Sequence, residues 1–481
     1  MKRAKLWSIA GSATLLVAAL PAPGADLLSV YDQALQHDPQ IHQAEATLNA
    51  NREARPQAWA NLLPAFQASG GKTKSWDSTT GFRESPLINF ATREYVGKYP
   101  APADGSSNGT TTQWTLTLRQ NLFSLPNVIA VMSANRQVAQ AEADFLSAQQ
   151  QLVQRVAQQY FAVLQAQDSV RSQEIARDAY TQQLDQAEQR FNVGLIAITD
   201  VQEARAAHDN AAANVIEAKR ALSSAEEQLR ATIGELPDSL NEPTDSMPLL
   251  TPDPASADDW VKAAMEQNPA LVSSRLAADI ARDTVRSTAG SFAPSVDLVA
   301  TKGYNEPDNS SYTPTYSDTF ATHTKTHSKS IGIQFSMNLN GLGYGNYSRT
   351  KQSQYLWIAA KDRLELTSRN TERQARDAYL SVTSEISRVK ALRQALESQR
   401  TALAASQASY EVGTRTAVDV LNSRQALVAA EVSYSAAKYA YLNNLISLHL
   451  AAGTLDRGTL DQINKWLGPP PAAAPATTPA Q

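Results

Sequence analysis

Several short stretches of the chain alternate apolar and polar side chains, which is the pattern of a β-strand with two different faces. Each is close to the ~10 residues that a tilted membrane-crossing strand needs. The four runs lie at residues 66–71, 114–119, 296–301 and 331–339. They form two pairs, and each pair flanks a segment rich in Gly, Pro, Ser, Thr and Asn. This arrangement predicts two β-hairpins with long polar outer loops, at residues 76–110 and 304–328.

Long segments without helix breakers make up much of the remaining chain. Between Ser124 and Val193 the only breaker is Pro126, which a first helical turn accepts. Residues 346–412 contain neither Gly nor Pro. At ~1.5 Å per residue, each segment predicts a helix about 100 Å long. Apolar residues recur every seventh position in both, which indicates coiled-coil packing. The seam residues are Leu146, Val153, Tyr160, Val156, Val163, Val170, Val389, Leu396, Leu403 and Tyr410.

The chain contains an internal duplication. RFNVGLIAITDV at residues 190–201 recurs in altered form as SYEVGTRTAVDV at residues 409–420. In each copy a single glycine, Gly194 or Gly413, separates two breaker-free segments. Glycine adopts the left-handed conformation that ends one helix and lets the chain reverse. We therefore predict two long antiparallel helical hairpins with their tips at these glycines.

The preceding segments are duplicated as well. Each reads as a helix that is interrupted early, at Asp38-Pro39 or Asn268-Pro269, and that ends at a proline, Pro64 or Pro294. The predicted fold class is an α+β membrane protein built as a tandem repeat. The expected parts are a signal peptide (1–25), a first repeat (26–234, with a β-hairpin at 64–123 and a helical hairpin at 124–234), a proline-rich linker (235–257), a second repeat (258–453, with a β-hairpin at 294–340 and a helical hairpin at 345–453), a C-terminal segment with one short helix (454–467) and a disordered Pro/Ala-rich tail (468–481).

The composition places the protein in a bacterial envelope. A basic start, an apolar run at residues 6–20 and small residues before Ala25 read as a secretory signal. The formal net charge is −4, which argues against a nucleic-acid partner. There is no cysteine, so disulfides and a lipid-modified N-terminal cysteine are excluded. No later apolar run reaches the ~18 residues of a membrane helix, so we expect membrane entry through a β-barrel.

Four strands are too few for a barrel, since about eight are the minimum in outer-membrane barrels. Open strand edges are not tolerated in lipid, so several copies must share one barrel. Two copies would supply about eight strands around a filled interior, whereas three would supply about twelve and could enclose a lumen.

Catalytic signatures are missing from the sequence. It has no G-x-S-x-G, no HExxH and no cysteine nucleophile. His323 and His327 lie four apart in an outer loop, but no acidic residue lies between them. Gly341, Gly343 and Gly345 superficially suggest a phosphate loop, and a strand-to-helix turn explains them better. We expect no enzyme activity, cofactor or metal.

The duplicated plan and its motifs closely resemble the TolC family of trimeric outer-membrane export channels. The shared motifs are RFNVGLIAITDVQEAR at 190–205, VGTRTAVDVLNSRQAL at 412–427 and LHLAAGTLDRGTLDQINKWL at 448–467. The resemblance implies a 12-stranded barrel shared by three chains and an α-helical tunnel in the periplasm, with an equatorial belt near its middle. It also implies a periplasmic adaptor and an inner-membrane RND or ABC transporter as partners, with drugs or secreted proteins as cargo.

The resemblance further implies where the periplasmic end closes. Polar links would join Thr199 and Asp200 on one hairpin to Tyr410 and Arg415 on the other, because a carboxylate accepts bonds from a guanidinium and a phenol. The narrowest ring matches Asp419, and a second acidic ring of the family is replaced here by Asn422. The adaptor would dock on the tips at Gly194, Leu195, Gly413 and Thr414.

The same residues and segments also allow other interpretations. Asp200 and Asp419 follow turns, where acidic residues stabilise helix starts without any further role. A trimeric coiled-coil adhesin also combines long helices with four strands per chain, although its strands would lie together at the C-terminus. An envelope enzyme on a helical scaffold is a third reading, and it lacks a reactive group of residues.

Overall fold

The computed structural model describes residues 24–102, 104–244, 247–313 and 318–469. The predicted signal peptide and C-terminal tail lie almost wholly outside these ranges and stay predictions. The chain divides into two compact units. The helical unit comprises residues up to Glu45, Asp144–Val272 and the chain from Thr367 on, and the strand-bearing unit comprises Ala46–Ala143 and Ser273–Leu366.

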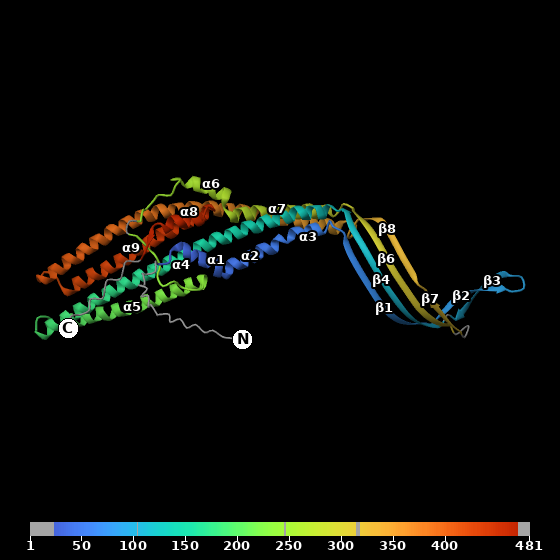
Figure 1. Ribbon diagram of the computed structural model, residues 1–481, viewed down its shortest axis with the longest axis horizontal. Coiled ribbons are helices and arrows are strands. Elements are labelled where there is room, and N and C mark those ends of the chain that lie inside the picture. Colours follow the sequence, from blue (N-terminus) through green and yellow to red (C-terminus); the bar gives the residue numbers. More distant parts are fainter. Residues whose placement is uncertain (1–23, 103, 245–246, 314–317, 470–481) are drawn as a thin grey trace, which may run out of the picture. The chain divides into compact units, whose positions relative to one another are not determined.

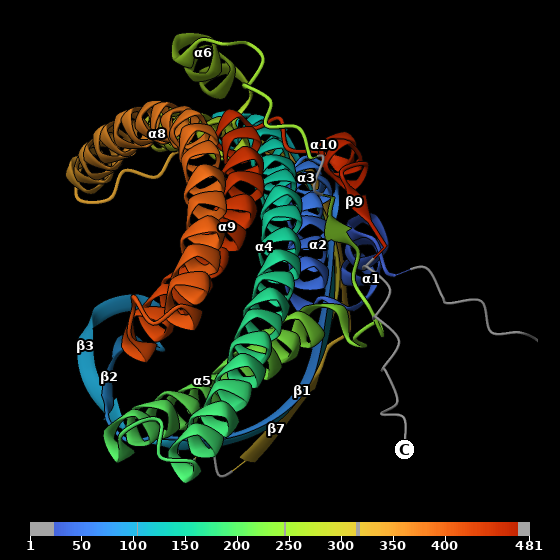
Figure 2. The same cartoon turned by 90° about the vertical axis from the view of Figure 1, so that its left-hand side faces the viewer.

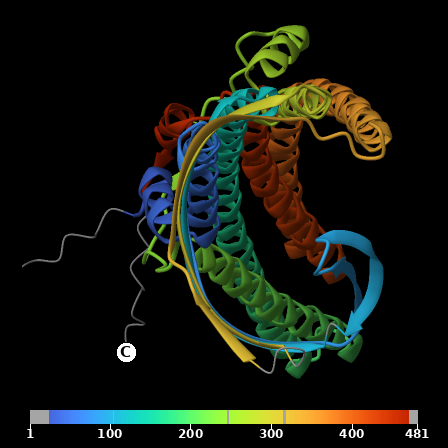
Figure 3. The same cartoon turned by 90° about the vertical axis from the view of Figure 1, so that its right-hand side faces the viewer.

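The strand-bearing unit is built on one antiparallel sheet. Strand β1 (Ala65–Thr79) pairs with β4 (Gly105–Phe123), and β4 pairs with β6 (Ser295–Thr313). The other side of β6 pairs with two strands. β8 (Thr326–Ser336) pairs with residues 295–305 of β6, and β7 (Asp318–His323) pairs with residues 308–313. The four strand paths run side by side, and the sheet curves strongly (Figures 1 and 3). The edge of β1 away from β4 and the edge formed by β7 and β8 have no strand neighbour among the described residues.

The predicted pairs of strands are confirmed, but the predicted outer loops are wrong. Residues 76–110 contain the ends of β1 and β4 together with a further hairpin, β2 (Phe82–Asn89) and β3 (Glu94–Pro102). Residues 304–328 are mostly strand as well. Thr, Ser and Asn fill the outer ends of β1, β4 and β6, and β-branched Thr in particular suits an extended backbone. β2 and β3 instead contain apolar residues interrupted by Gly and Pro. The sequence therefore resembles a loop, although a strand can be polar on both faces.

The predicted helices are confirmed closely. α4 (Leu125–Asn192) and α8 (Tyr344–Glu411) each contain 68 residues, and Pro126 lies in the first turn of α4. α1 (Leu27–His37) and α2 (Pro39–Arg52) separate at Asp38, and α6 (Ala257–Gln267) and α7 (Pro269–Gly290) separate at Asn268. A short α3 (Ala54–Ala60) follows α2. Within the described ranges, none of the helices has an apolar stretch long enough to cross a bilayer.

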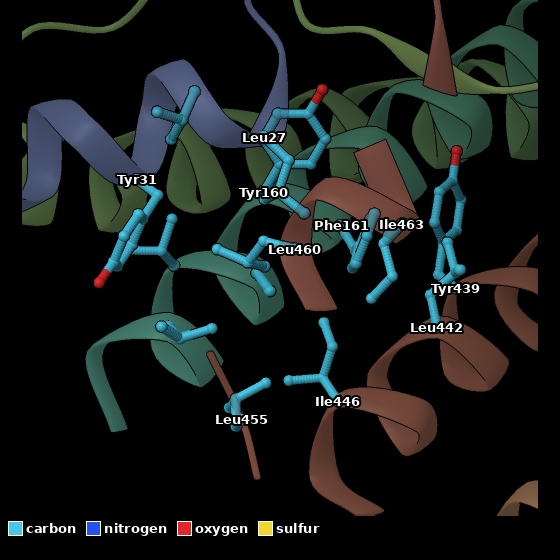
Figure 4. Packing of buried hydrophobic residues seen from close by; sticks show 14 of the residues in the cluster. Leu27, Tyr31, Tyr160, Phe161, Tyr439, Leu442, Ile446, Leu455, Leu460 and Ile463 are labelled. Atoms are coloured by element: carbon cyan, nitrogen blue, oxygen red, sulfur yellow. The ribbon is translucent and has the colours of Figure 1, made fainter. Parts of the chain in front are cut away.

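The hydrophobic core lies in the helical unit. It is formed by α1, α4, α5 (Ile198–Ile233), α8, α9 (Ala417–Ala452) and α10 (Arg457–Asn464). Tyr160 and Phe161 of α4 pack edge to face, and Phe161 also meets Tyr439 of α9 (Figure 4). β5 (Glu242–Pro243) pairs with β9 (Leu467–Gly468), which ties the linker to the C-terminal segment. Six residues of the predicted coiled-coil seam, namely Val153, Val156, Val163, Val389, Leu396 and Leu403, are buried within one chain, whereas Leu146 is 45% exposed there.

The Tyr160 hydroxyl fixes the start of the described chain. It is fully buried, and its single proton is shared between the backbone oxygens of Asn241, at 2.7 Å, and Ala25, at 3.1 Å, of which Asn241 is the closer acceptor. Ala25 in turn exchanges backbone hydrogen bonds with Ser239 and Asn241. Burial raises the pKa of Tyr160 well above its ordinary value, so the hydroxyl stays a donor.

We expect Tyr160→Phe to lower the free energy of unfolding by about 1–3 kcal/mol, because the Asn241 carbonyl loses the buried Tyr160 donor. The measurement is denaturant or thermal unfolding in detergent. Tyr434→Phe is the matched control. Tyr434 is half-buried, its hydroxyl makes no hydrogen bond within the described chain, and its contact with Lys438 is made by the ring, which phenylalanine keeps. Equal stability of the two variants would contradict the role of the Tyr160 hydroxyl.

Candidate functional site at the hairpin tips

The two tips reverse by the same backbone motif. Gly194 and Gly413 have φ angles of 78° and 80°, as the left-handed turn requires. The residue after each glycine donates back across the last turn of its helix: Leu195 N–H to the Arg190 carbonyl and Thr414 N–H to the Ser409 carbonyl, both at 2.9 Å. This is a Schellman closure. α4 with α5, and α8 with α9, therefore form the two predicted hairpins (Figure 2).

In the second tip, Asp419 caps its own helix. Its carboxylate accepts from the Thr416 N–H at 2.9 Å and the Thr416 hydroxyl at 2.8 Å, and its N–H donates to that hydroxyl at 3.3 Å. The result is a reciprocal capping box at the start of α9. The bonds from the Thr416 backbone and side chain, and more weakly the Arg415 charge, hold the pKa of Asp419 below its ordinary value. Asp419 thus has a structural role, and its carboxylate remains partly exposed.

In the first tip, the equivalent Asp200 has no such bond. The N-cap of α5 is Ala197, which has no side chain that could complete a capping box. Among the described residues, Asp200 has neither a hydrogen-bond partner nor an ion-pair partner for its carboxylate, and it is partly exposed. Both carboxylates lie in the first turn of their helix, where a negative charge is favourable, but only Asp419 is hydrogen-bonded there and Asp200 keeps an unbonded carboxylate.

Tyr410 is held by a residue that the sequence prediction missed. Arg190 Nη1 donates to the Tyr410 hydroxyl at 3.0 Å, and its guanidinium lies 5.2 Å from the centre of the Tyr410 ring. The contact joins the end of α4 to the end of α8, so it links the two hairpins within one chain. Arg190 opens the first repeated motif, but nothing in its local sequence indicates a partner on the other hairpin.

The remaining predicted tip residues face outward. Arg415 is exposed, and in the described part of the chain its guanidinium has no hydrogen-bond or ion-pair partner. Thr199 is exposed, and Thr414 closes its own turn through a bond from its hydroxyl to the Ser409 carbonyl. The tips also expose apolar side chains: Val193, Leu195, Ile198 and Val412 are 69%, 74%, 49% and 75% exposed. Within one chain these side chains are uncovered.

Asn422 lies beside a groove between the two hairpins. The groove has a volume of about 700 Å³ and is lined by α4, α5 and α9, including Tyr180, Glu203, Asn210 and Gln425. Asp419 does not line it. Asp419 and Asn422 lie three residues apart on α9, so they are neighbours on its surface, and of the two only Asn422 lines the groove.

The histidines of the outer segment engage neighbouring side chains. His323 lies 3.3 Å from the Glu306 carboxylate, which also pairs with Lys325, and His327 packs on the Tyr304 ring. Across the described residues, no three His, Cys, Asp or Glu side chains group as a metal site would need. The glycines at 341–345 form the turn that enters α8, as expected.

Comparisons with known proteins agree with this geometry. The family model described as "Outer membrane efflux protein" matches residues 30–235 and 260–454. Outer membrane protein TolC of Escherichia coli is 31% identical, covering 94% of this chain and 86% of that protein. Alkaline protease secretion protein AprF of Pseudomonas aeruginosa is 30% identical, covering 96% and 91%. The CmeC outer membrane channel of Campylobacter jejuni superposes with a TM-score of 0.70 at 17% identity, covering 97% of both chains.

Duplicated helical hairpins on paired strands define the class of trimeric outer-membrane channels, with barrel-forming strands and a helical periplasmic tunnel. The chain belongs to the outer membrane efflux protein family. It is an outer-membrane exit duct for efflux and type I secretion, a homotrimer that works with a periplasmic adaptor and an inner-membrane transporter. The family consists of outer-membrane channel proteins and not of enzymes.

The Arg190–Tyr410 contact generates a prediction. We expect Arg190→Ala to loosen the second tip and to raise the rate of tryptic cleavage after Arg415 about 2–5-fold, which corresponds to a loss of about 0.5–1 kcal/mol. Arg205→Ala is the matched control. It removes an equal charge and breaks the 2.7 Å Arg205–Glu188 pair inside the first hairpin, without touching Tyr410. Equal cleavage rates in the two variants would show that the link does not hold the tip.

Proposed function

We propose that the two hairpin tips of three copies form the periplasmic gate of this duct. The observation that carries the proposal is the difference between the repeats. Asp419 is engaged in a capping box, whereas Asp200 keeps a free carboxylate because Ala197 replaces the capping threonine. On the other hairpin, Arg415 keeps an exposed, unbonded guanidinium. A free carboxylate and a free guanidinium on neighbouring hairpin surfaces are complementary partners.

In the closed gate, Arg415 of one copy bonds Asp200 and Thr199 of the next. Tyr410 stays on Arg190 of its own chain, at 3.0 Å, and this contact holds the second tip in place. An exposed ion pair contributes only about 0.2–1 kcal/mol, so three pairs close the entrance weakly enough for a docked partner to open it. Adaptor docking uses the exposed apolar side chains around Gly194, Leu195, Gly413 and Thr414, because uncovered apolar surface at a tip is suited to a protein contact.

We also propose that the duct passes secreted proteins as well as small toxic compounds and catalyses no reaction itself. The relatives named for protease secretion, AprF and PrtF, support protein cargo. Expression in a strain without its own exit duct tests this. Restored secretion of a type I protease and restored drug resistance are expected. Loss of both functions despite a correctly inserted trimer would overturn the proposal.

Arg415→Ser should widen the entrance. The variant removes the guanidinium that faces Asp200, so we expect higher single-channel conductance and greater antibiotic sensitivity with the trimer intact. Arg415→Lys is the control, since it keeps the charge and should stay near wild type. If conductance in Arg415→Ser equals that of wild type, Arg415 closes nothing.

Asp419 should make the entrance cation-preferring through its charge. Asp419→Asn keeps an acceptor for the Thr416 cap but removes the charge, whereas Asp419→Ala removes both. We expect both variants to reduce cation selectivity, measured as reversal potential across a salt gradient, and Asn422→Asp to increase it. An ordinary Asp side chain has a pKa of about 3.9. Because the pKa of Asp419 is lowered, its carboxylate stays charged to a lower pH than that, and we expect the cation preference to persist with it. If Asp419→Asn keeps the cation selectivity of wild type, the charge of Asp419 does not set the selectivity and the residue only caps its helix.

A further inference from the structure

The β2–β3 hairpin is a separate two-stranded sheet inserted between β1 and β4. It projects past the ends of the main strands and does not lie on the sheet of its own chain (Figures 1 and 3). Its root is fixed: Gly81 N–H donates to the Asp104 carboxylate at 3.0 Å. A bulge between Leu87 and Ile88 further bends the hairpin. The insertion is therefore an oriented element and not an extended loop.

The hairpin carries apolar side chains that nothing in its own chain covers. Phe82 is 78% exposed, Phe90 at its turn 93%, and Tyr95 62%. Its further exposed apolar residues are Leu87, Ile88, Val96 and Tyr99. Two-stranded hairpins are at best marginally stable alone in water, and uncovered aromatic groups of this kind mark interaction surfaces. A stable hairpin here requires a partner.

The charge of the hairpin favours a protein partner. Arg83, Arg93 and Lys98 are nearly balanced by Glu84 and Glu94, and Lys98 pairs with Glu84 at 2.8 Å. Phosphate-rich lipid headgroups attract clustered Lys and Arg, which this surface lacks. Aromatic residues with few unpaired charges are instead characteristic of the centre of protein–protein interfaces.

The position of the hairpin identifies the partner. β1 has no strand neighbour on its outer edge, so in the trimer that edge pairs with the opposite edge, β7 and β8, of the next copy. β1 ends at Thr79 and β2 begins at Phe82, so the hairpin leaves the sheet at this interface. The outer end of the next copy's edge exposes Phe320 on β7, which is 54% exposed. Tyr312 on β6 is 43% exposed, but it pairs with Thr319 whereas Phe320 pairs with Ser311, so the two aromatic side chains point to opposite faces of the sheet.

We propose that the β2–β3 hairpin is a clasp between subunits, whose aromatic side chains pack on β7 and the outer end of β6 of the neighbouring copy. The clasp extends the shared barrel interface beyond the strand edges. It rests on the trimeric barrel and not on the gate proposed above.

Photo-crosslinking tests the partner directly. Benzoylphenylalanine at position 90, 95 or 320 should give covalent dimers of this chain that survive boiling in SDS, with peptides joining residues 82–102 to 318–323. Leu250, which is 54% exposed in the linker, serves as the control position and should give no adduct to either segment. Adducts with lipopolysaccharide, adducts within one chain, or none at all would overturn the clasp.

Removing the clasp tests its contribution. Replacing residues 82–102 by a short Gly/Ser turn should shift the dissociation of the SDS-resistant trimer to a lower temperature while the channel still conducts. The triple variant Phe82→Ser, Phe90→Ser, Tyr95→Ser should act in the same direction and replaces the deletion if that variant does not assemble. Glu84→Gln with Lys98→Gln, which removes the ion pair but keeps the aromatic residues, is the control. An unchanged dissociation temperature counts against the clasp, whereas a monomeric wild-type protein counts against the trimeric channel itself.

Discussion

An unpaired strand edge in hydrocarbon leaves a row of backbone N–H and C=O groups without partners, at a cost of several kcal/mol each. The sheet of this chain has two such edges, on β1 and on β7 with β8. No rearrangement within four strands can close them, because the strands are too few for a barrel. Association of copies is therefore built into the chain. The features that belong to the trimer, including the proposed gate and the proposed clasp, depend on these two edges.

The duplication supplied two similar hairpins, and a few substitutions gave them different roles. Thr416 and Asp419 complete a capping box in the second tip, whereas Ala197 leaves Asp200 unbonded in the first. Arg190, in the first repeat, meets Tyr410 of the second, so the two hairpins contact each other through residues at matching ends of their helices. Identical hairpins would offer identical surfaces, whereas the diverged repeats leave an unbonded Asp200 carboxylate on one tip and an unbonded Arg415 guanidinium on the other.

The buried core and the hairpin tips lie in different parts of the helical unit. Its large buried aromatic residues, Tyr160, Phe161 and Tyr439, gather where the N-terminal, linker and C-terminal segments converge. The tips hold few buried residues and are joined by a small number of polar contacts. Regions with few buried apolar contacts open at low free energy. A duct that must remain assembled while its entrance opens is consistent with this distribution.

The sequence by itself determined the elements whose causes are local. Gly194 and Gly413 fix the tips because a left-handed residue is needed there, and heptad spacing and the absence of breakers fix α4 and α8. Only the tertiary structure decided the partners. The Arg190–Tyr410 contact depends on the lateral register of helices far apart in the chain. The capping difference between Asp419 and Asp200, in contrast, follows from the local sequence, because Thr416 stands at one N-cap and Ala197 at the other. The β2–β3 hairpin is missed for a different reason: its apolar residues do not alternate and its strands contain Pro and Gly, so only pairing defines them.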